Sequence, residues 1–105
     1  MEITRGEFLI STDRSRLDFK MIQRFLVEDS YWACERTPEQ TATAIENSFC
    51  FGVYHEEIQV GFARVVSDRA TFAYLGDVFI IEEYRGRGLS KWLMGAIIGH
   101  PELQG

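Results

Sequence analysis

The chain has 105 residues, a formal net charge of −5 and 46% hydrophobic residues, of which many are aromatic. This length predicts one domain with a single core, and the composition predicts a packed interior rather than a disordered chain. The acidic balance argues against a general binder of nucleic acid or of anionic membranes, because either partner requires a basic face. We therefore expect one domain over residues 1–105, with neither a nucleic-acid nor a membrane partner.

The two cysteines, Cys34 and Cys50, have neither C-x-x-C spacing nor a histidine at metal-ligand spacing. They are therefore expected to be free thiols in a reducing compartment, and no metal site is expected. The first residues contain no apolar signal segment, and no apolar run reaches the length that spans a membrane. These features predict a cytoplasmic protein.

The first half of the chain predicts one strand and two helices. A short strand is expected over residues 7–11. Apolar residues at helical spacing then predict a helix over residues 19–27 with Asp18 at its N-cap. The sequence Thr37-Pro38-Glu39-Gln40 has the pattern of a capping box with proline at the first helical position, and it begins a second helix that ends near Asn47.

An aromatic segment over residues 30–34 lies between the two predicted helices, and its sequence has no clear period. One interpretation is that its rings close the core beneath a loop. The alternative is that Tyr31 and Trp32 line a substrate entrance, because loops on a rigid scaffold often carry specificity.

The second half of the chain predicts a β-hairpin, a further strand and a helix. Alternating apolar residues predict strands over residues 49–53 and 58–66, joined by a polar turn over residues 54–57. The nearly continuous apolar run over residues 71–81, interrupted by Gly76 and Asp77, is typical of a central strand covered on both faces.

The last predicted helix runs from Gly88 to Gly99 and is stopped by Pro101. It buries Leu89, Leu93, Ala96, Ile97 and His100 on one face. Its two internal glycines, Gly95 and Gly99, predict close packing against the sheet, because each weakens a helix by about 1 kcal/mol relative to alanine. The last residues, 103–105, read as the start of another strand.

The segment between the last strand and the last helix is the main functional candidate. In Tyr84-Arg85-Gly86-Arg87-Gly88-Leu89-Ser90-Lys91, glycines allow close backbone approach and the helix N-terminus attracts phosphate. The dinucleotide fingerprint G-x-G-x-x-G is not met, because Lys91 occupies the third glycine position, and no Gly-Lys pair exists for a P-loop. An RNA-binding RNP1 segment would require aromatic residues where Arg87 and Leu89 stand. A pocket for a pyrophosphate-bearing ligand is therefore expected.

With the preceding strand, this segment resembles the R/Q-x-x-G-x-G/A motif of the GCN5-related N-acetyltransferase (GNAT) superfamily. Arg85 to Ser90 match the motif, and the order β-α-α-β-β-β-α agrees over essentially the whole chain. The resemblance implies an α+β, three-layer fold with a central, mostly antiparallel sheet flanked by helices. It also implies an enzyme that transfers an acetyl group from acetyl-CoA to a primary amine of a small molecule or protein, by direct attack.

The resemblance assigns the acetyl-CoA contacts to two segments. Backbone amides from the corner would hold the pyrophosphate, and the pantetheine arm would pair with the preceding strand as an extra strand. The cofactor-binding residues implied in this way are Val78, Phe79, Ile80, Arg85, Gly86, Arg87, Gly88, Leu89 and Ser90.

No residue is assigned as catalytic. Asp77 is a candidate base on the strand, although a hydrogen-bonded carboxylate that fixes a loop is the plainer interpretation. Glu82 and Glu83 read as solvated turn residues, and His55 and His100 read as structural.

The family's fifth strand and the following helix, which often supplies a tyrosine acid, would lie beyond Gly105. The chain is therefore expected to be a C-terminally truncated acyltransferase-like domain. The strand at 71–81 would then expose an apolar edge, which predicts a homo-oligomer that covers it. A catalytically incomplete acetyl-CoA-binding module remains the alternative function.

Overall fold

The computed structural model of the protein describes residues 1–68 and 70–100. Its strands are β1 (Glu2–Arg5), β2 (Phe8–Ser11), β3 (Phe49–His55), β4 (Ile58–Ser67) and β5 (Ala73–Ile80). Its helices are α1 (Phe19–Glu28), α2 (Pro38–Glu46) and α3 (Leu89–Gly99), with short 3-10 turns η1 (Arg14–Arg16) and η2 (Glu82–Tyr84).

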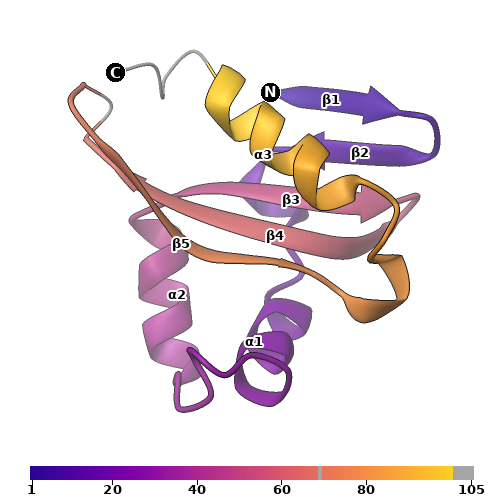
Figure 1. Cartoon of the computed structure of the whole chain (residues 1–105). Coiled ribbons are helices and arrows are strands. Elements are labelled where there is room, and N and C mark those ends of the chain that lie inside the picture. Colours follow the sequence, from indigo (N-terminus) through magenta and orange to yellow (C-terminus); the bar gives the residue numbers. More distant parts are fainter. Residues whose placement is uncertain (69, 101–105) are drawn as a thin grey trace.

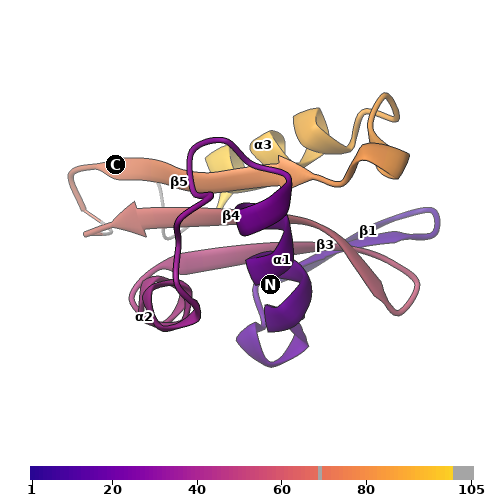
Figure 2. The same cartoon turned by 90° about the horizontal axis from the view of Figure 1, so that it is seen from below.

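The protein has three layers. The five strands form one antiparallel sheet in the order β1-β2-β3-β4-β5. Helix α3 lies against one face of this sheet, and α1 and α2 lie against the other (Figures 1 and 2). This arrangement confirms the predicted α+β fold and the predicted order of elements after the first strand.

Local sequence signals fix the starts of α1 and α2. The Asp18 side chain accepts a hydrogen bond from the Met21 backbone N–H at 3.1 Å, as an N-cap does. At α2 the capping box is complete, because Thr37 Oγ1 accepts from Gln40 N–H and Gln40 Oε1 accepts from Thr37 N–H. Both helix starts therefore lie where the sequence predicts them.

Two apolar clusters hold the layers together, one on each face of the sheet. The cluster under α3 contains most of the predicted apolar face of that helix: Leu89, Leu93, Ala96 and Ile97. The cluster under α1 contains Phe25, which stacks on Phe79 of β5 with ring centroids 3.8 Å apart. Strand β5 is therefore anchored to both helical layers near its C-terminal end.

Strand β1 was not predicted. It pairs with β2 through a turn at Gly6, and the pair covers the edge of β3. Most of β1 is exposed, so its sequence lacks the alternation of apolar and polar residues that marks a half-buried strand. The predicted strand over residues 7–11 is found as β2, Phe8–Ser11.

Strand β3 is longer than predicted, and the predicted turn over residues 54–57 is wrong in its first half. Tyr54 is buried in β3, and the turn is limited to Glu56 and Glu57. Tyr54 and His55 continue the pairing with β4, opposite Gln59 and Ile58, and the extra residue of the register shift lies on β4 at Val60. Strand β3 therefore extends beyond Val53, the last apolar residue of the predicted alternation.

Strand β5 lies at the edge of the described sheet, so the prediction of a strand covered along both faces is only partly correct. Residues 73–75 are exposed, and coverage begins at Asp77. Ala63 pairs with Val78 and Val65 with Leu75, so β5 has one extra residue, a β-bulge, opposite Arg64. Bulges bend an edge strand and redirect its side chains.

The predicted close packing of Gly95 and Gly99 is wrong. A Cβ atom added at either position would have no neighbour within 4 Å. Both glycines are exposed on the outer side of α3, so they lower its intrinsic helix stability without a packing reason. The helix ends at Gly99, ahead of Pro101; Pro101 and the predicted strand start at 103–105 lie outside the described residues.

The two cysteines are free in the structure, with Cys34 exposed and Cys50 buried. Within residues 1–68 and 70–100, no helix has the length and apolar character needed to cross a bilayer.

Candidate functional site

The glycine–arginine corner, residues 85–90, joins η2 to α3. Gly86 and Gly88 have φ angles of +79° and +78°, which residues with a Cβ atom adopt only with strain. The first backbone hydrogen bond of α3 joins Trp92 N–H to Gly88 O at 3.0 Å. The N–H groups of residues 89–91 precede it, and Gly88 provides no side-chain cap. Such a helix start binds anions through its amides and its dipole.

The two arginines of the corner are fixed by local contacts. Arg85 Nε donates to the Ile80 carbonyl oxygen at 2.9 Å, and the Arg87 guanidinium lies over the Tyr84 ring, 4.8 Å from its centroid. Both side chains remain exposed. They therefore add positive charge at the corner, although water screens much of its effect.

A groove of about 400 Å³ runs along the outer edge of β5. Its lining residues, which define the edge groove, are Phe25, Asp29, Tyr31, Trp32, Val78, Phe79, Ile80, Arg85 and Ser90. The structure thus brings both predicted cofactor segments, on β5 and at the corner, to one surface together with the aromatic pair of the α1–α2 loop.

Four of the predicted cofactor-binding residues do not line the edge groove. Gly86, Arg87 and Gly88 are exposed at the corner, and the side chain of Leu89 is buried in the core under α3. Leu89 could therefore contact a ligand only through its backbone, which is the contact that the resemblance implies for it.

Asp77 forms a clamp between β5, β4 and the α1–α2 loop. Its carboxylate accepts hydrogen bonds from Trp32 Nε1 at 2.9 Å, from Arg36 Nη1 at 3.0 Å and from Arg64 Nε at 3.0 Å. Arg64 reaches it because Gly76 has no side chain: a Cβ atom there would lie 2.6 Å from Arg64 Nη2. We call this group the Asp77 clamp.

The environment of Asp77 makes it a poor general base. Burial raises the pKa of its carboxyl, but the hydrogen bonds from Arg36, Trp32 and Arg64 outweigh burial and hold the pKa below its usual value. A base must take up a proton readily, and this carboxylate already accepts hydrogen bonds from three side chains. The structure therefore agrees with the interpretation of Asp77 as a carboxylate that fixes a loop.

The α1–α2 loop lines the edge groove with Tyr31 and Trp32, and hydrogen bonds hold the loop on both sides of this pair. At its start, Ser30 Oγ donates to Leu26 O at 2.6 Å and accepts from Ala33 N–H at 3.2 Å. At its end, Trp32 is bonded to the Asp77 clamp. Tyr31 packs edge-on against Trp32 with centroids 5.5 Å apart, and it is 90% exposed. Trp32 is therefore held by the Asp77 clamp, and the two rings form a wall of the edge groove outside the core.

Asp29 is a groove residue that the sequence analysis missed. Its backbone N–H caps the end of α1 by donating to Phe25 O at 2.8 Å, and the residue lines the edge groove. A single acidic residue after a helix carries no motif, so only the folded structure could identify it.

A second depression of about 260 Å³ adjoins the edge groove and shares Phe25, Asp29 and Arg85 with it. Arg24, Glu82 and Glu83 complete its polar lining. Both glutamates are exposed in η2, in agreement with their interpretation as solvated turn residues.

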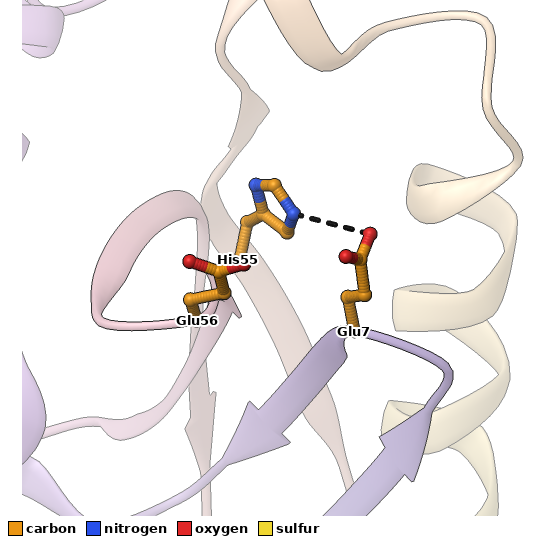
Figure 3. A group of neighbouring side chains, drawn as sticks. All are labelled: Glu7, His55 and Glu56. Carbon is orange, nitrogen blue, oxygen red and sulfur yellow. Dashed lines mark ion pairs between the residues drawn. The ribbon is translucent and has the colours of Figure 1, made fainter.

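His55 connects the corner to the N-terminal hairpin. Its Nδ1 is 2.8 Å from the Tyr84 hydroxyl, and its ring stacks on Phe8 with centroids 4.9 Å apart. Figure 3 shows Glu7 facing the other ring nitrogen of His55, 3.5 Å away, with Glu56 beside them. His55 thus supports Tyr84, the residue before the corner.

Ligand atoms of Glu7, His55 and Glu56 lie within 4.8 Å of one another. Both glutamates are exposed at turns, and the His55 ring nitrogens already face Tyr84 and Glu7. We describe this cluster as a structural contact and assign it no ion. His100 is likewise structural in position, because it is buried edge-on against Phe49 and Phe51.

Comparison with protein families identifies one similarity that spans most of the chain. The model of the Acetyltransferase (GNAT) family matches residues 19–104. A "Putative acetyltransferase" of Gibberella zeae is 32% identical over 124 residues, which cover 96% of this chain and 70% of that protein. An "Uncharacterized N-acetyltransferase" of Gracilaria tenuistipitata var. liui is 36% identical over 75 residues, 67% of this chain and 41% of that protein.

A solved structure shows the same similarity in three dimensions. It is the crystal structure of a "putative acetyltransferase belonging to the gnat family" from Xanthomonas campestris pv. campestris. The two chains are 52% identical and superpose with a TM-score of 0.91, over 93% of this chain and 69% of the other.

Proposed function

This chain belongs to the Acetyltransferase (GNAT) family of acyltransferases, and on that premise we propose that it transfers an acetyl group from acetyl-CoA to a primary amine by direct attack. The observation that carries the proposal is the edge groove. It joins the outer edge of β5 to a helix start with uncapped amides, and these are the two kinds of surface that an elongated thioester with a pyrophosphate group requires.

The residues at the corner fit the pyrophosphate. Backbone N–H groups of residues 86–91 would bind its oxygens, and Arg85 and Arg87 would add screened attraction. The positive φ angles of Gly86 and Gly88 set the direction of these amides.

The outer edge of β5 fits the pantetheine arm. Within the described residues β5 pairs only with β4, so its outward N–H and C=O groups over residues 78–80 remain available for an extended amide-containing partner, except the Ile80 carbonyl oxygen, which accepts from Arg85 Nε. A ligand paired there would extend the sheet by one strand, and its thioester end would approach the wall formed by Tyr31 and Trp32.

The proposed reaction forms an amide bond and breaks a thioester bond. An ammonium first releases a proton to solvent, because only the neutral amine is nucleophilic. The amine nitrogen then bonds to the acetyl carbonyl carbon, the carbon–sulfur bond breaks, and the departing thiolate takes up the second proton of the nitrogen. The Asp77 carboxylate accepts hydrogen bonds from three side chains, and we assign neither proton transfer to a side chain.

Amine-dependent release of thiol tests the proposal. Purified protein is mixed with acetyl-CoA and a panel of primary amines, and free thiol is measured with time. Thiol release that rises with amine concentration and yields the N-acetyl product supports transfer. Acetyl-CoA binding without amine-dependent thiol release would instead indicate a binding module, and would contradict the proposal.

We further propose that the chain forms one domain over residues 1–105 and that a second copy covers the N-terminal half of β5. Phe72, Tyr74 and Leu75 are exposed together at this edge, and exposed apolar edge strands are normally covered. Light scattering is expected to give at least twice the monomer mass of 12.1 kDa. A stable monomer at micromolar concentration would exclude this assembly.

A further inference from the structure

His55 is the last residue of β3, and its side chain reaches the turn that precedes the glycine–arginine corner. Its Nδ1 lies 2.8 Å from the hydroxyl oxygen of Tyr84, the residue before the corner. From this contact we infer that His55 is a positioning residue whose protonation strengthens the binding of the acetyl-CoA pyrophosphate at the corner. This inference rests on the proposed binding of acetyl-CoA and adds a proton-linked regulation to that site.

The neighbours of His55 decide which ring nitrogen carries the hydrogen. The Glu7 carboxylate faces Nε2 at 3.5 Å, so it favours a hydrogen on that nitrogen (Figure 3). In the neutral ring Nδ1 then accepts a hydrogen bond from the Tyr84 hydroxyl. In the protonated ring Nδ1 also carries a hydrogen, so Nδ1 donates and the Tyr84 oxygen accepts. Protonation therefore reverses this hydrogen bond and frees the hydroxyl hydrogen of Tyr84 for another acceptor.

The charged groups around the ring can compensate an imidazolium. The groups that face His55, directly or through the Tyr84 ring, are Glu7 of the β1–β2 turn, Glu56 of the β3–β4 turn, and Tyr84 with Arg87 over its ring. Glu82 and Glu83, which share η2 with Tyr84, instead line the depression beside the edge groove. The two facing carboxylates keep their charge when the ring protonates, so the local charge still rises by one unit.

Aromatic contacts hold the ring against the corner. His55 stacks on Phe8 with centroids 4.9 Å apart, and Phe8 packs edge-on against Tyr84 at 6.1 Å. The His55 side chain is 24% exposed, so water screens its charge less than the charge of a fully exposed residue. A change in the charge of His55 therefore acts at a fixed position beside the corner.

Protonation of His55 adds one positive charge beside a site proposed to bind a pyrophosphate with two negative charges. Imidazole is the side-chain group that ordinarily gains charge between pH 8 and pH 5. In partly screened surroundings one unit charge changes the affinity for a nearby dianion about threefold. Because the coupling of two ligands is reciprocal, binding of acetyl-CoA would in turn favour the protonated ring.

Calorimetric titration of wild type and His55→Gln with acetyl-CoA tests the inference. The ratio of the Kd of His55→Gln to the Kd of wild type is expected to be about threefold larger at about pH 5.5 than at about pH 8. The 3′-phosphate of the ligand also titrates in this range, but equally for both proteins. Glu57→Gln is the control, because Glu57 is exposed in the neighbouring turn and its ratio should not change with pH. The same ratio for His55→Gln at both pH values would show a merely structural role and overturn the inference.

Proton NMR of wild type provides a second test that needs no variant. His55 is expected to protonate at a pH higher by about half a unit in the acetyl-CoA complex than in the free protein, which is the same threefold effect on a pH scale. The other histidine of the chain, His100, is buried at the opposite end of α3 and serves as the internal control. No shift for His55, or an equal shift for both histidines, would overturn the inference.

These tests separate the inference from the proposed function, because they require binding and not turnover. Proton-linked binding at His55 without amine-dependent thiol release would support the inference and refute acetyl transfer. Amine-dependent thiol release with a Kd ratio that does not change with pH would support acetyl transfer and refute the role of His55. Absence of acetyl-CoA binding would overturn both.

Discussion

Replacing Asp77 with asparagine is expected to destabilise the protein strongly, because this residue joins three parts of the fold. The Asp77 side chain is 3% exposed, and the Arg36 and Arg64 side chains that pair with it are 20% and 17% exposed. Asparagine has nearly the same shape but no charge. Asp77→Asn would therefore leave two largely buried guanidinium groups without a counter-ion.

The magnitude follows from the interactions that the substitution removes. Removing one partner of a buried ion pair costs about 3–5 kcal/mol, and a hydrogen bond to a charged group contributes about 1.5–3 kcal/mol. One of the donors can still bond to the asparagine oxygen, so we expect the free energy of unfolding at pH 7 to fall by about 3–4 kcal/mol. For a domain of this size the corresponding fall in Tm is about 15–20 °C.

The effect depends on pH in a direction fixed by the lowered pKa of Asp77. Because the folded-state pKa is lower than the unfolded-state value of about 3.9, the ionised carboxylate stabilises the fold above that value. This contribution is lost as the pH falls through the folded-state pKa. The difference between wild type and Asp77→Asn should therefore be complete at about pH 6–7 and shrink below about pH 4.

Urea denaturation followed by circular dichroism at several pH values measures both predictions. Glu57→Gln is the control, because Glu57 is exposed in the β3–β4 turn and its substitution should change stability by less than about 0.5 kcal/mol. A decrease below about 1 kcal/mol for Asp77→Asn at pH 7, or a difference that does not change with pH, would refute the clamp as described.

Two further predictions concern the corner and the cysteines. Tyr84→Phe removes the hydroxyl contact with His55 but keeps the ring beneath Arg87, so the Kd for acetyl-CoA measured by calorimetry should rise a few-fold. Tyr74→Phe is the control, because Tyr74 is exposed and its substitution should leave this Kd unchanged. Equal Kd values for the two variants would contradict the supporting role of His55. Burial raises the pKa of the Cys50 thiol to about 11, so iodoacetamide at pH 8 should label only the exposed Cys34 in the native protein. Mass spectrometry measures the labelling. Rapid labelling of both cysteines would contradict the buried position of Cys50.

The sequence predicts the parts of the fold that depend on local chemistry. The capping box at Thr37, the N-cap at Asp18 and the buried face of α3 are each set by neighbouring residues, and each is found where predicted. Strand β1 is mostly exposed and has no apolar alternation, and the end of β3 is set by its pairing with β4 across a register shift, so the local pattern contains neither.

The candidate site likewise has one part that the sequence predicts and another that only the folded structure shows. The corner at residues 85–90 has a recognisable pattern because backbone geometry demands glycine at two positions. The Asp77 clamp joins residues separated by up to 45 positions in the chain, and Asp29 faces β5 only after α1 packs on the sheet. Long-range contacts of single polar residues leave no periodic signal, so only the structure identifies them.

Calorimetric titration with acetyl-CoA of wild type and two glycine variants is the most direct test of the central claim. Gly88→Val strains the corner at its positive φ angle, and Gly6→Val imposes similar strain on the β1–β2 turn, away from the edge groove. We expect saturable one-site binding to wild type and to Gly6→Val, and a Kd at least about tenfold higher for Gly88→Val. Equal affinity of Gly88→Val and wild type, or no binding by wild type, would contradict the central claim.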